Sequence, residues 1–184
     1  MKDRGLREKD FKLGCLHGKL HAENERSEAQ IQRTIFLSQR IKVWRKINLA
    51  PIIRIFGYEV PLDHGNRRGR CVDLMGYDEH HNLYIIELKK KESNEKIEKA
   101  IEQLNDYAGS VKEILLCIQN EFEKTFFFPI IFNGIKKMII APREFYKGKK
   151  NLLTDETIDY GHFLDRDINT RKPGNIINIH LQKK

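Results

Sequence analysis

The chain has 184 residues, of which 40% are hydrophobic and 33% are charged, a composition typical of a globular domain and unlike a disordered segment. Lysine and arginine number 34 against 26 aspartates and glutamates, and the resulting net charge of +8 favours a polyanionic partner without requiring one. The three cysteines form no paired pattern, and no apolar run has the length of a membrane span or the character of a signal peptide. We therefore expect reduced thiols in a cytoplasmic protein that has no membrane partner.

The N-terminal part of the chain is predicted to contain one helix. Residues 1–26 are charged and weakly periodic, and we expect a loose arm there. Ser27 and Gln30 fit a capping box, which predicts a helix from Glu28 to Lys46. Glu28 lies on the apolar side of this helix, where an acid is unexpected, although negative charge also stabilises a helix N-terminus.

Three strands are predicted after Pro51. Residues 52–60 are rich in isoleucine and aromatic side chains, and residues 70–77 and 83–88 are mainly apolar. The last two segments are separated by the polar turn 78–82, so we expect them to form an antiparallel hairpin.

Acidic residues interrupt the apolar pattern of this hairpin. Asp73 lies beside Glu87 in the expected pairing, and Glu87 and Lys89, two apart on one strand, share a face. Burying such groups is costly unless they pair or hold an ion. Two close carboxylates raise each other's proton affinity, and a divalent cation with hard oxygen ligands, Mg²⁺ or Mn²⁺, removes that conflict.

Basic residues flank the hairpin on both sides. A glycine-rich basic loop at 64–70 precedes the Asp73 strand, and two lysines follow Lys89. Their side chains are suited to phosphate contacts through charge-assisted hydrogen bonds, and a solvated turn is the alternative. The candidate nucleic-acid contacts are Arg67, Arg68, Arg70, Lys90 and Lys91.

A second helix is predicted after the hairpin, with Ser93 as its cap. Apolar residues recur at spacings of three and four from Ile97 to Ile118, which predicts one continuous helix. Gln103 and Tyr107, four residues apart, lie together on one flank of this apolar stripe. Their presence there indicates either a role at the hairpin or ordinary packing at the edge of the stripe.

The remaining elements are a core strand at 135–141, a short helix near 154–164 and a late strand at 175–181. We expect three segments: an N-terminal arm at 1–26, a core at 27–142 and a C-terminal extension packed on that core at 143–184.

Two motifs in this order carry a family resemblance. Asp73, thirteen residues, then Glu87-Leu88-Lys89 resembles the D…(D/E)xK signature of the PD-(D/E)XK nuclease superfamily, and Gln103 to Tyr107 resembles the QxxxY helix motif of its RecB-like branch. The match covers roughly residues 27–142, and Val72 replaces the proline of the signature. The resemblance implies an α/β fold with a restriction-endonuclease-like αβββαβ core, in which a mixed central sheet is flanked by helices.

The resemblance also implies a function, a metal-dependent nuclease that hydrolyses DNA with Mg²⁺ or Mn²⁺. It assigns a catalytic set of Asp73, Glu87, Lys89, Gln103 and Tyr107. It nominates as metal ligands Asp73, Glu87, the backbone carbonyl of Leu88, and Glu28. Lys89 would orient the attacking water or stabilise the charged phosphate, and Gln103 and Tyr107 would position the scissile strand.

Two alternatives remain open from the sequence. One is a nuclease-like module that binds nucleic acid without cutting it, and the other is a structural protein with a coincidental motif. Carboxylate-dependent binding of Mn²⁺ separates both from the nuclease hypothesis. The strandedness of the substrate, an exo- or endonuclease mode and the oligomeric state, a homodimer included, stay open.

Overall fold

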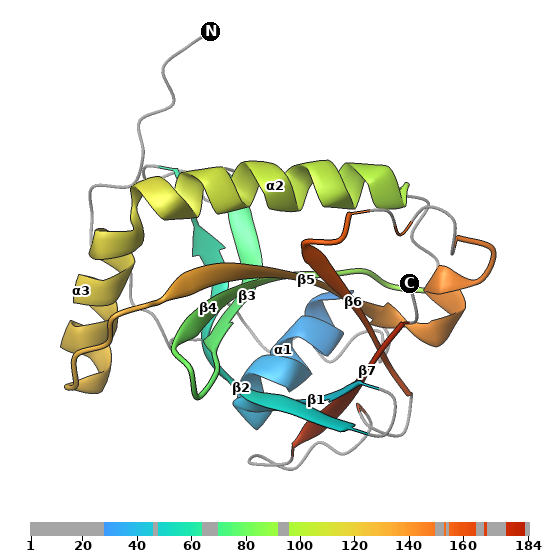
Figure 1. Ribbon diagram of the computed structural model, residues 1–184, viewed down its shortest axis with the longest axis horizontal. Coiled ribbons are helices and arrows are strands. Elements are labelled where there is room, and N and C mark those ends of the chain that lie inside the picture. Colours follow the sequence, from blue (N-terminus) through green and yellow to red (C-terminus); the bar gives the residue numbers. More distant parts are fainter. Residues whose placement is uncertain are drawn as a thin grey trace, which may run out of the picture.

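The computed structural model describes residues 28–45, 48–63, 70–91, 96–149, 153, 155–164, 168 and 176–182. Within these ranges seven strands form one mixed sheet that closes into a barrel in sequence order, accompanied by three α-helices (Figure 1). The arm predicted at 1–26, Arg67, Arg68 and Ser93 lie outside the described residues. Among the described helices, none is both long enough and apolar enough to cross a membrane.

The elements follow one another along the chain as α1 (Glu28–Ser38), β1 (Arg40–Arg45), β2 (Asn48–Pro61), β3 (Cys71–Tyr77), β4 (Asn82–Leu88), α2 (Ile97–Glu113), α3 (Leu115–Phe126), β5 (Gly134–Pro142), the 3₁₀ turn η1 (Arg143–Tyr146), β6 (Ile158–Phe163) and β7 (Ile177–Leu181). Strand pairs β1–β2, β2–β3, β3–β4 and β6–β7 are antiparallel. Pairs β4–β5, β5–β6 and β1–β7 are parallel. The mixed sheet expected from the sequence is therefore confirmed, and β6 and β7 belong to it.

Two apolar cores lie on the two faces of this sheet. Helix α1 lies inside the ring of strands and packs on the inner core, whereas α2 and α3 cover the outside of β3, β4 and β5 (Figure 1). Successive residues of β3 and β4 alternate between the cores: Leu74 and Ile86 belong to the inner one, Met75 and Ile85 to the outer one. The hairpin is thus covered on both faces, as its apolar sequence predicted.

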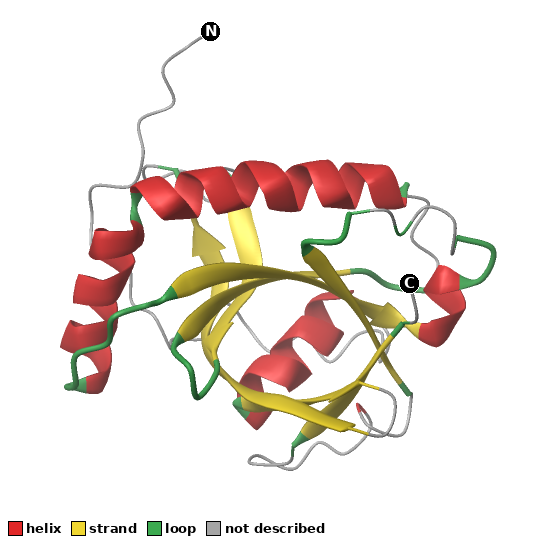
Figure 2. Ribbon diagram, viewed as in Figure 1, coloured by secondary structure: helices red, strands yellow, loops and turns green. Residues whose placement is uncertain are grey.

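The helix predicted to run to Lys46 is wrong beyond Ser38 (Figure 2). Gln39 has a φ of 59°, a left-handed conformation that ends the helix. After it, Ile41 and Val43 are buried and alternate with more exposed neighbours, and both are β-branched residues that favour a strand. The chain therefore passes directly from α1 into β1.

The single helix predicted through Ile118 is also wrong, because two helices meet at Ile114. Ile114 leaves the helical conformation with a ψ of 15°. Leu104, Val111 and Ile118 all belong to the same outer core, so the apolar stripe continues across the break. The first of the two helices starts at Ile97, and its N-cap residue is Lys96.

The C-terminal predictions have mixed outcomes. The helix near 154–164 is wrong, because Ile158–Phe163 forms β6 between β5 and β7. The strands expected at 135–141 and 175–181 are confirmed as β5 and β7. The three strands predicted after Pro51 are confirmed as β2, β3 and β4.

Candidate functional site

The turn between β3 and β4 fixes the register of the hairpin. Asp78 accepts hydrogen bonds from the backbone N–H groups of His80 and Asn82, from the Asn82 amide and from the Tyr84 hydroxyl. Burial acts to raise the pKa of Asp78, but the hydrogen bonds from Asn82 and the others outweigh it, so the pKa is lowered and the carboxylate stays charged.

The register set by this turn brings Asp73 next to Glu87. Leu74 pairs with Ile86, and one further step of the same pairing places Asp73 opposite Glu87. The Asp73 Oδ2 atom accepts a 2.7 Å hydrogen bond from the Leu88 backbone N–H. The backbone at the end of β4 therefore fixes the Asp73 carboxylate at the open end of the hairpin, away from the turn.

The surroundings of Asp73 shift its pKa upward. Burial raises the pKa of Asp73 well above its usual range, and the negative charge of Glu87 raises it further. The Leu88 hydrogen bond and the Lys89 ammonium act in the opposite direction, and the charge of Glu28 adds a smaller upward effect. The charged form of Asp73 is thus disfavoured, first by burial and then by the nearby charge of Glu87.

Lys89 supplies the positive charge nearest to Glu87. Its Nζ atom donates a 2.8 Å hydrogen bond to Glu87 Oε1, and the two side chains are only 5% and 4% exposed. The Lys89 backbone N–H donates to the Ile140 carbonyl at 2.9 Å, which ties this residue to β5. The acid and the lysine predicted to share one face of β4 therefore form a buried ion pair.

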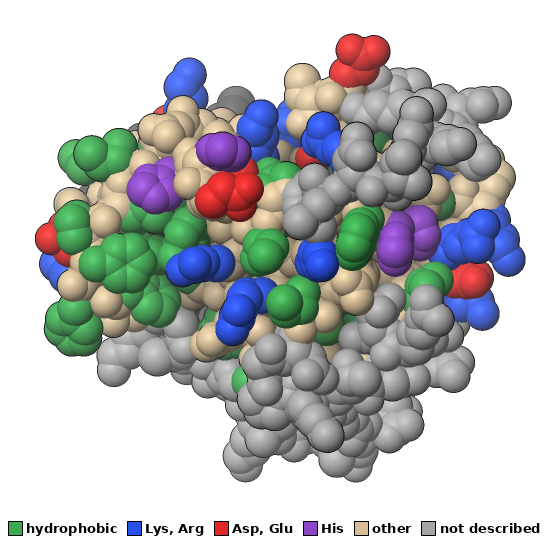
Figure 3. All heavy atoms as spheres, turned by 60° about the horizontal axis from the view of Figure 1, so that its bottom comes forward, with side chains coloured by type: hydrophobic (Ala, Val, Ile, Leu, Met, Phe, Trp, Pro, Cys, Tyr) green, Lys and Arg blue, Asp and Glu red, His purple; other side chains and the backbone are tan. Residues whose placement is uncertain are grey.

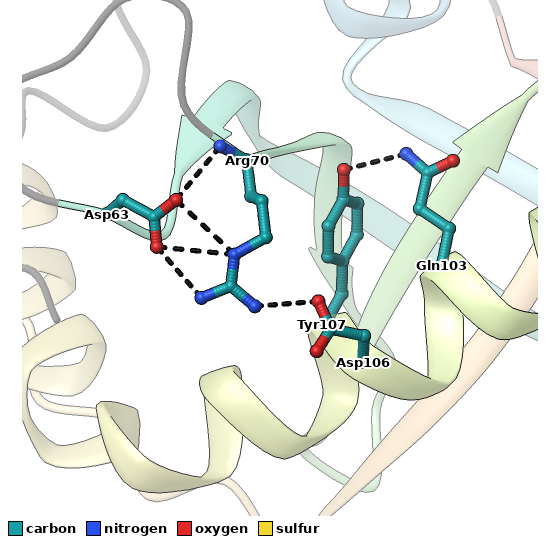
Figure 4. Close-up of polar contacts among 5 residues, drawn as sticks. All are labelled: Asp63, Arg70, Gln103, Asp106 and Tyr107. Atoms are coloured by element: carbon teal, nitrogen blue, oxygen red, sulfur yellow. Dashed lines mark hydrogen bonds and ion pairs between the residues drawn. The ribbon is translucent and has the colours of Figure 1, made fainter. Parts of the chain in front are cut away.

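The two polar residues on the flank of α2 contact each other beside these acids. Gln103 Nε2 donates to the Tyr107 hydroxyl at 2.7 Å, and the two side chains point toward one another (Figure 4). Burial raises the pKa of Tyr107, and the charges of Glu87 and Asp73 raise it further despite the Gln103 hydrogen bond. The phenol therefore lies within electrostatic reach of both carboxylates and stays protonated.

Helix α1 reaches the same region from inside the barrel. Glu28 Oε2 accepts a 3.3 Å hydrogen bond from the Lys90 backbone N–H, and Gln32 Nε2 donates to the Asp73 carbonyl at 3.1 Å. These residues are four apart and so lie on one side of the helix. Sequence reasoning found Glu28 but missed Gln32, although the i, i+4 spacing was the signal that could have identified it.

Arg70 links the start of β3 to α2. Its Nη2 atom lies 2.8 Å from Asp63 Oδ1, and its Nη1 atom lies 2.6 Å from Asp106 Oδ2 (Figure 4). These hydrogen bonds raise the pKa of the guanidinium above its usual range. Arg70 thus connects the start of β3 to α2 one residue before Tyr107. Both terminal nitrogens of its guanidinium are paired with carboxylates. Its role as a nucleic-acid contact stays a prediction.

Comparison with known protein families matches residues 23–145 to the type I restriction enzyme R protein N terminus. The match covers about two thirds of the chain and includes every residue of the site described above. The chain belongs to this family. Searches of curated proteins and of solved structures each returned no match. The family match spans α1 to β5 and leaves β6 and β7 outside it.

The site of this type I restriction enzyme R-protein domain offers hard oxygen donors suited to Mg²⁺ or Mn²⁺. In the described part of the chain, no three His, Cys, Asp or Glu side chains gather as a metal cluster. If a cation binds here, Asp73 and Glu87 would be its side-chain ligands, with Leu88 adding a backbone carbonyl. The raised pKa of Asp73 is consistent with this fit, because a bound cation would offset both the burial of the carboxylate and its repulsion from Glu87. Glu28 stays a prediction as a further ligand.

The predicted basic contacts divide into two groups. Lys90 and Lys91 follow the ion-paired Lys89 directly and are exposed. Arg67 and Arg68 belong to the loop that lies outside the described residues.

Glu59 was missed by sequence reasoning. The pairs Tyr58–Leu74 and Val60–Val72 flank it, so Glu59 lies on β2 directly beside the Asp73 position of β3. Burial and the charge of Glu59 together raise the pKa of Cys71. The signal that could have identified Glu59 was an acidic residue within the otherwise mainly apolar segment 52–60.

Proposed function

We propose that this chain is a metal-dependent nuclease of the PD-(D/E)XK type that hydrolyses DNA phosphodiester bonds with Mg²⁺ or Mn²⁺. The single observation that carries the proposal is the arrangement at the end of the hairpin. Two adjacent carboxylates, Asp73 and Glu87, lie at the end of the hairpin, and one buried lysine, Lys89, is paired with Glu87. A fold has little reason to bury such a set for stability, because well-packed apolar residues of the same volume are often as stable or more so. Membership of a restriction-enzyme family supports the same conclusion.

Asp73 and Glu87 would hold the cation, together with the Leu88 carbonyl. When bound, the ion lowers the pKa of a coordinated water and neutralises charge that develops on the phosphate. Asp73 must be ionised to bind it, and its raised pKa means that binding strengthens as pH rises through that pKa. The Leu88 N–H keeps the Asp73 carboxylate in place for this role.

Lys89 and Tyr107 supply donors next to the carboxylates. The Lys89 ammonium is held by Glu87 at the same edge of the sheet, where it would orient the attacking water or stabilise the charged phosphate oxygens. Gln103 donates to the Tyr107 oxygen, which leaves the phenol hydrogen to be donated to a substrate oxygen. Arg70 pairs with Asp106 of α2, one residue before Tyr107.

The net charge of +8 supports a nucleic-acid substrate, and Lys90 and Lys91 extend the basic character of Lys89 to the surface. The loop arginines Arg67 and Arg68 are proposed as further phosphate contacts.

Cleavage of labelled single- and double-stranded oligonucleotides in Mn²⁺ tests the proposal. Glu87→Gln should abolish cleavage, and Lys89→Met should lower the rate by a factor on the order of 10²–10³, as when one group that stabilises the transition state is lost. Glu79→Gln is the matched control, because Glu79 is exposed at the far end of the same hairpin. Cleavage by Glu87→Gln at the parent rate would contradict the proposal. DNA binding by the parent without any cleavage would favour an inactive binding module.

A further inference from the structure

A cavity of about 480 Å³ lies at the opposite end of β3 from Asp73. Its size is within the range of small-molecule sites. Its lining includes two arginines and five aromatic residues: Arg40, Arg54, Phe56, Tyr77, Phe122, Phe126 and Phe128. None of them takes part in the candidate nuclease site.

Phe122 contacts the other aromatic residues that line the cavity. Its ring centroid lies 4.6 Å from that of Phe126, 5.1 Å from that of Phe128 and 5.6 Å from that of Tyr77. Phe127 ends α3 in a left-handed conformation with φ 59°, and Phe128 contacts Phe122 again directly after it. Phe128 is 44% exposed, so a ring packed edge-on against Phe122 presents part of its surface to solvent.

The positive charge of the cavity comes from two neighbouring strands. Arg40 of β1 pairs directly with Arg54 of β2, and Arg54 pairs with Tyr77 of β3, so the three residues form one row across the sheet. Both arginines are exposed, and within the described ranges neither forms an ion pair with a carboxylate. Like charges placed directly opposite each other destabilise a sheet, and an anionic ligand relieves that repulsion.

The surface view agrees with this description. Hydrophobic side chains gather over α3 and the loop after it, with Lys and Arg side chains alongside (Figure 3). An aromatic surface next to positive charge is the combination that binds single-stranded nucleic acid, because bases stack on the rings and phosphates meet the charges. An apolar protein partner would use the rings but would leave the charge of the two arginines unbalanced.

We propose that this cavity receives an unpaired base of a single-stranded nucleic-acid segment, with the base stacked on Phe128 and the adjoining phosphates on Arg40 and Arg54. The inference rests on the proposed function for the nature of the ligand. Asp73 and Tyr77 lie near opposite ends of β3, about 13 Å apart at roughly 3.3 Å per residue, and the outer core covers the face between them. A strand at about 3.4 Å per nucleotide would need about four nucleotides for the direct distance and more to pass around the covered face. The substrate would therefore carry its unpaired nucleotides at least about four positions from the scissile bond.

Fluorescence anisotropy with a labelled single-stranded oligonucleotide, in EDTA to prevent cleavage, tests this site in the full chain. Phe128→Ala should weaken binding about tenfold, as expected for the loss of one stacked base. The double variant Arg40→Gln/Arg54→Gln should lower the salt-dependence slope by about 0.7 for each phosphate that it no longer neutralises. Matched controls are Arg143→Gln and Ile131→Ala, which remove an exposed arginine and an exposed apolar side chain outside the cavity lining and should bind like the parent.

A second variant separates stacking from folding. Phe128→Leu keeps an apolar side chain against Phe122 but removes the planar ring, so it should bind as weakly as Phe128→Ala while its thermal unfolding stays like that of the parent. Parent-like binding by both Phe128 variants would overturn the inference. A dimer of the parent that Phe128→Ala dissolves, with unchanged oligonucleotide binding, would also overturn it and would assign the surface to a second copy of the chain.

The outcome is distinguishable from failure of the proposed nuclease function. If the parent binds through Phe128 and the arginines but does not cleave in Mn²⁺, the inference stands and the nuclease proposal fails. If the parent cleaves while the Phe128 and arginine variants bind and cleave like it, the nuclease proposal stands and the inference fails.

Discussion

Replacement of Lys89 by methionine should destabilise the metal-free protein in a way that a divalent cation reverses. Methionine keeps most of the side-chain volume but removes the ammonium that lies 2.8 Å from Glu87 Oε1. Both partners are almost completely buried, so solvent screens their interaction very little. Breaking a buried ion pair by removing one partner typically costs about 3–5 kcal/mol of unfolding free energy.

The loss should depend on pH with a definite sign. The Lys89 ammonium lowers the pKa of Asp73, so the variant raises that already elevated pKa further. Such a carboxyl group has a higher pKa in the folded protein than in the unfolded chain. Its contribution to folding stability is most favourable at pH values below the pKa in the unfolded chain, and it is lost as pH rises through the pKa in the folded protein. The difference between parent and variant should therefore grow with rising pH and shrink in acid.

Urea unfolding with and without Mn²⁺ measures both effects. A ligand at 100 times its Kd stabilises a protein by about 2.7 kcal/mol, and the gain should be larger in Lys89→Met, because the cation replaces the lost positive charge. Lys91→Met is the matched control, since Lys91 is exposed and should change stability by less than about 0.5 kcal/mol. A loss below about 1 kcal/mol in Lys89→Met, or no extra rescue by Mn²⁺, would refute this reasoning.

Two further predictions concern residues beside the site. Arg70→Gln should lower the free energy of unfolding in urea by about 1.5–3 kcal/mol, mostly because the ion pair with Asp63 is removed, whereas Asp106 is exposed and its ion pair contributes little. An unchanged urea midpoint would show that the ion pair between Arg70 and Asp63 does not stabilise the fold. Burial raises the pKa of Cys71 to about 11, so its alkylation rate, followed by mass spectrometry, should rise about tenfold for each pH unit from neutrality upward. A plateau in that rate near pH 8.5, about the ordinary thiol value, would contradict the environment described for Cys71.

The hairpin that carries the site could be predicted because its determinants are local. Asp78 and Asn82 form the polar turn through contacts at most six residues apart, and the strands on either side are apolar. Once that turn is fixed, the spacing alone brings Asp73 and Glu87 together. The contact between Gln103 and Tyr107 was likewise foreseeable from their helical spacing.

The missed elements depend on partners far away in the sequence. Residues 40–45 carry enough apolar residues to extend a helix, but Ile41 pairs with Ile53 on one side and with Ile177 on the other. β6 is stabilised as a strand by β5 and β7, and a Cβ atom at Gly161 would collide with the Ile179 side chain, so only glycine fits this pairing unchanged. Neither partner is visible in a local pattern.

The break between α2 and α3 could not be predicted for a different reason. The apolar stripe continues through Ile114 because both helices pack on the outer core. The spacing of apolar residues is therefore the same for one long helix and for two helices with different axes. Similarly, the sequence indicates that Arg70 is basic but not that Asp106, 36 residues later, holds it.

Asp73 and Glu87 are proposed to share one divalent cation, and isothermal titration with Mn²⁺ tests this most directly. The parent should bind one ion with an affinity that increases as pH rises through the raised pKa of Asp73. Asp73→Asn and Glu87→Gln, which keep side-chain shape but remove one charge each, should abolish binding, whereas Lys89→Met should retain or strengthen it. Equal Mn²⁺ affinity in the parent and in both carboxylate variants would contradict the account.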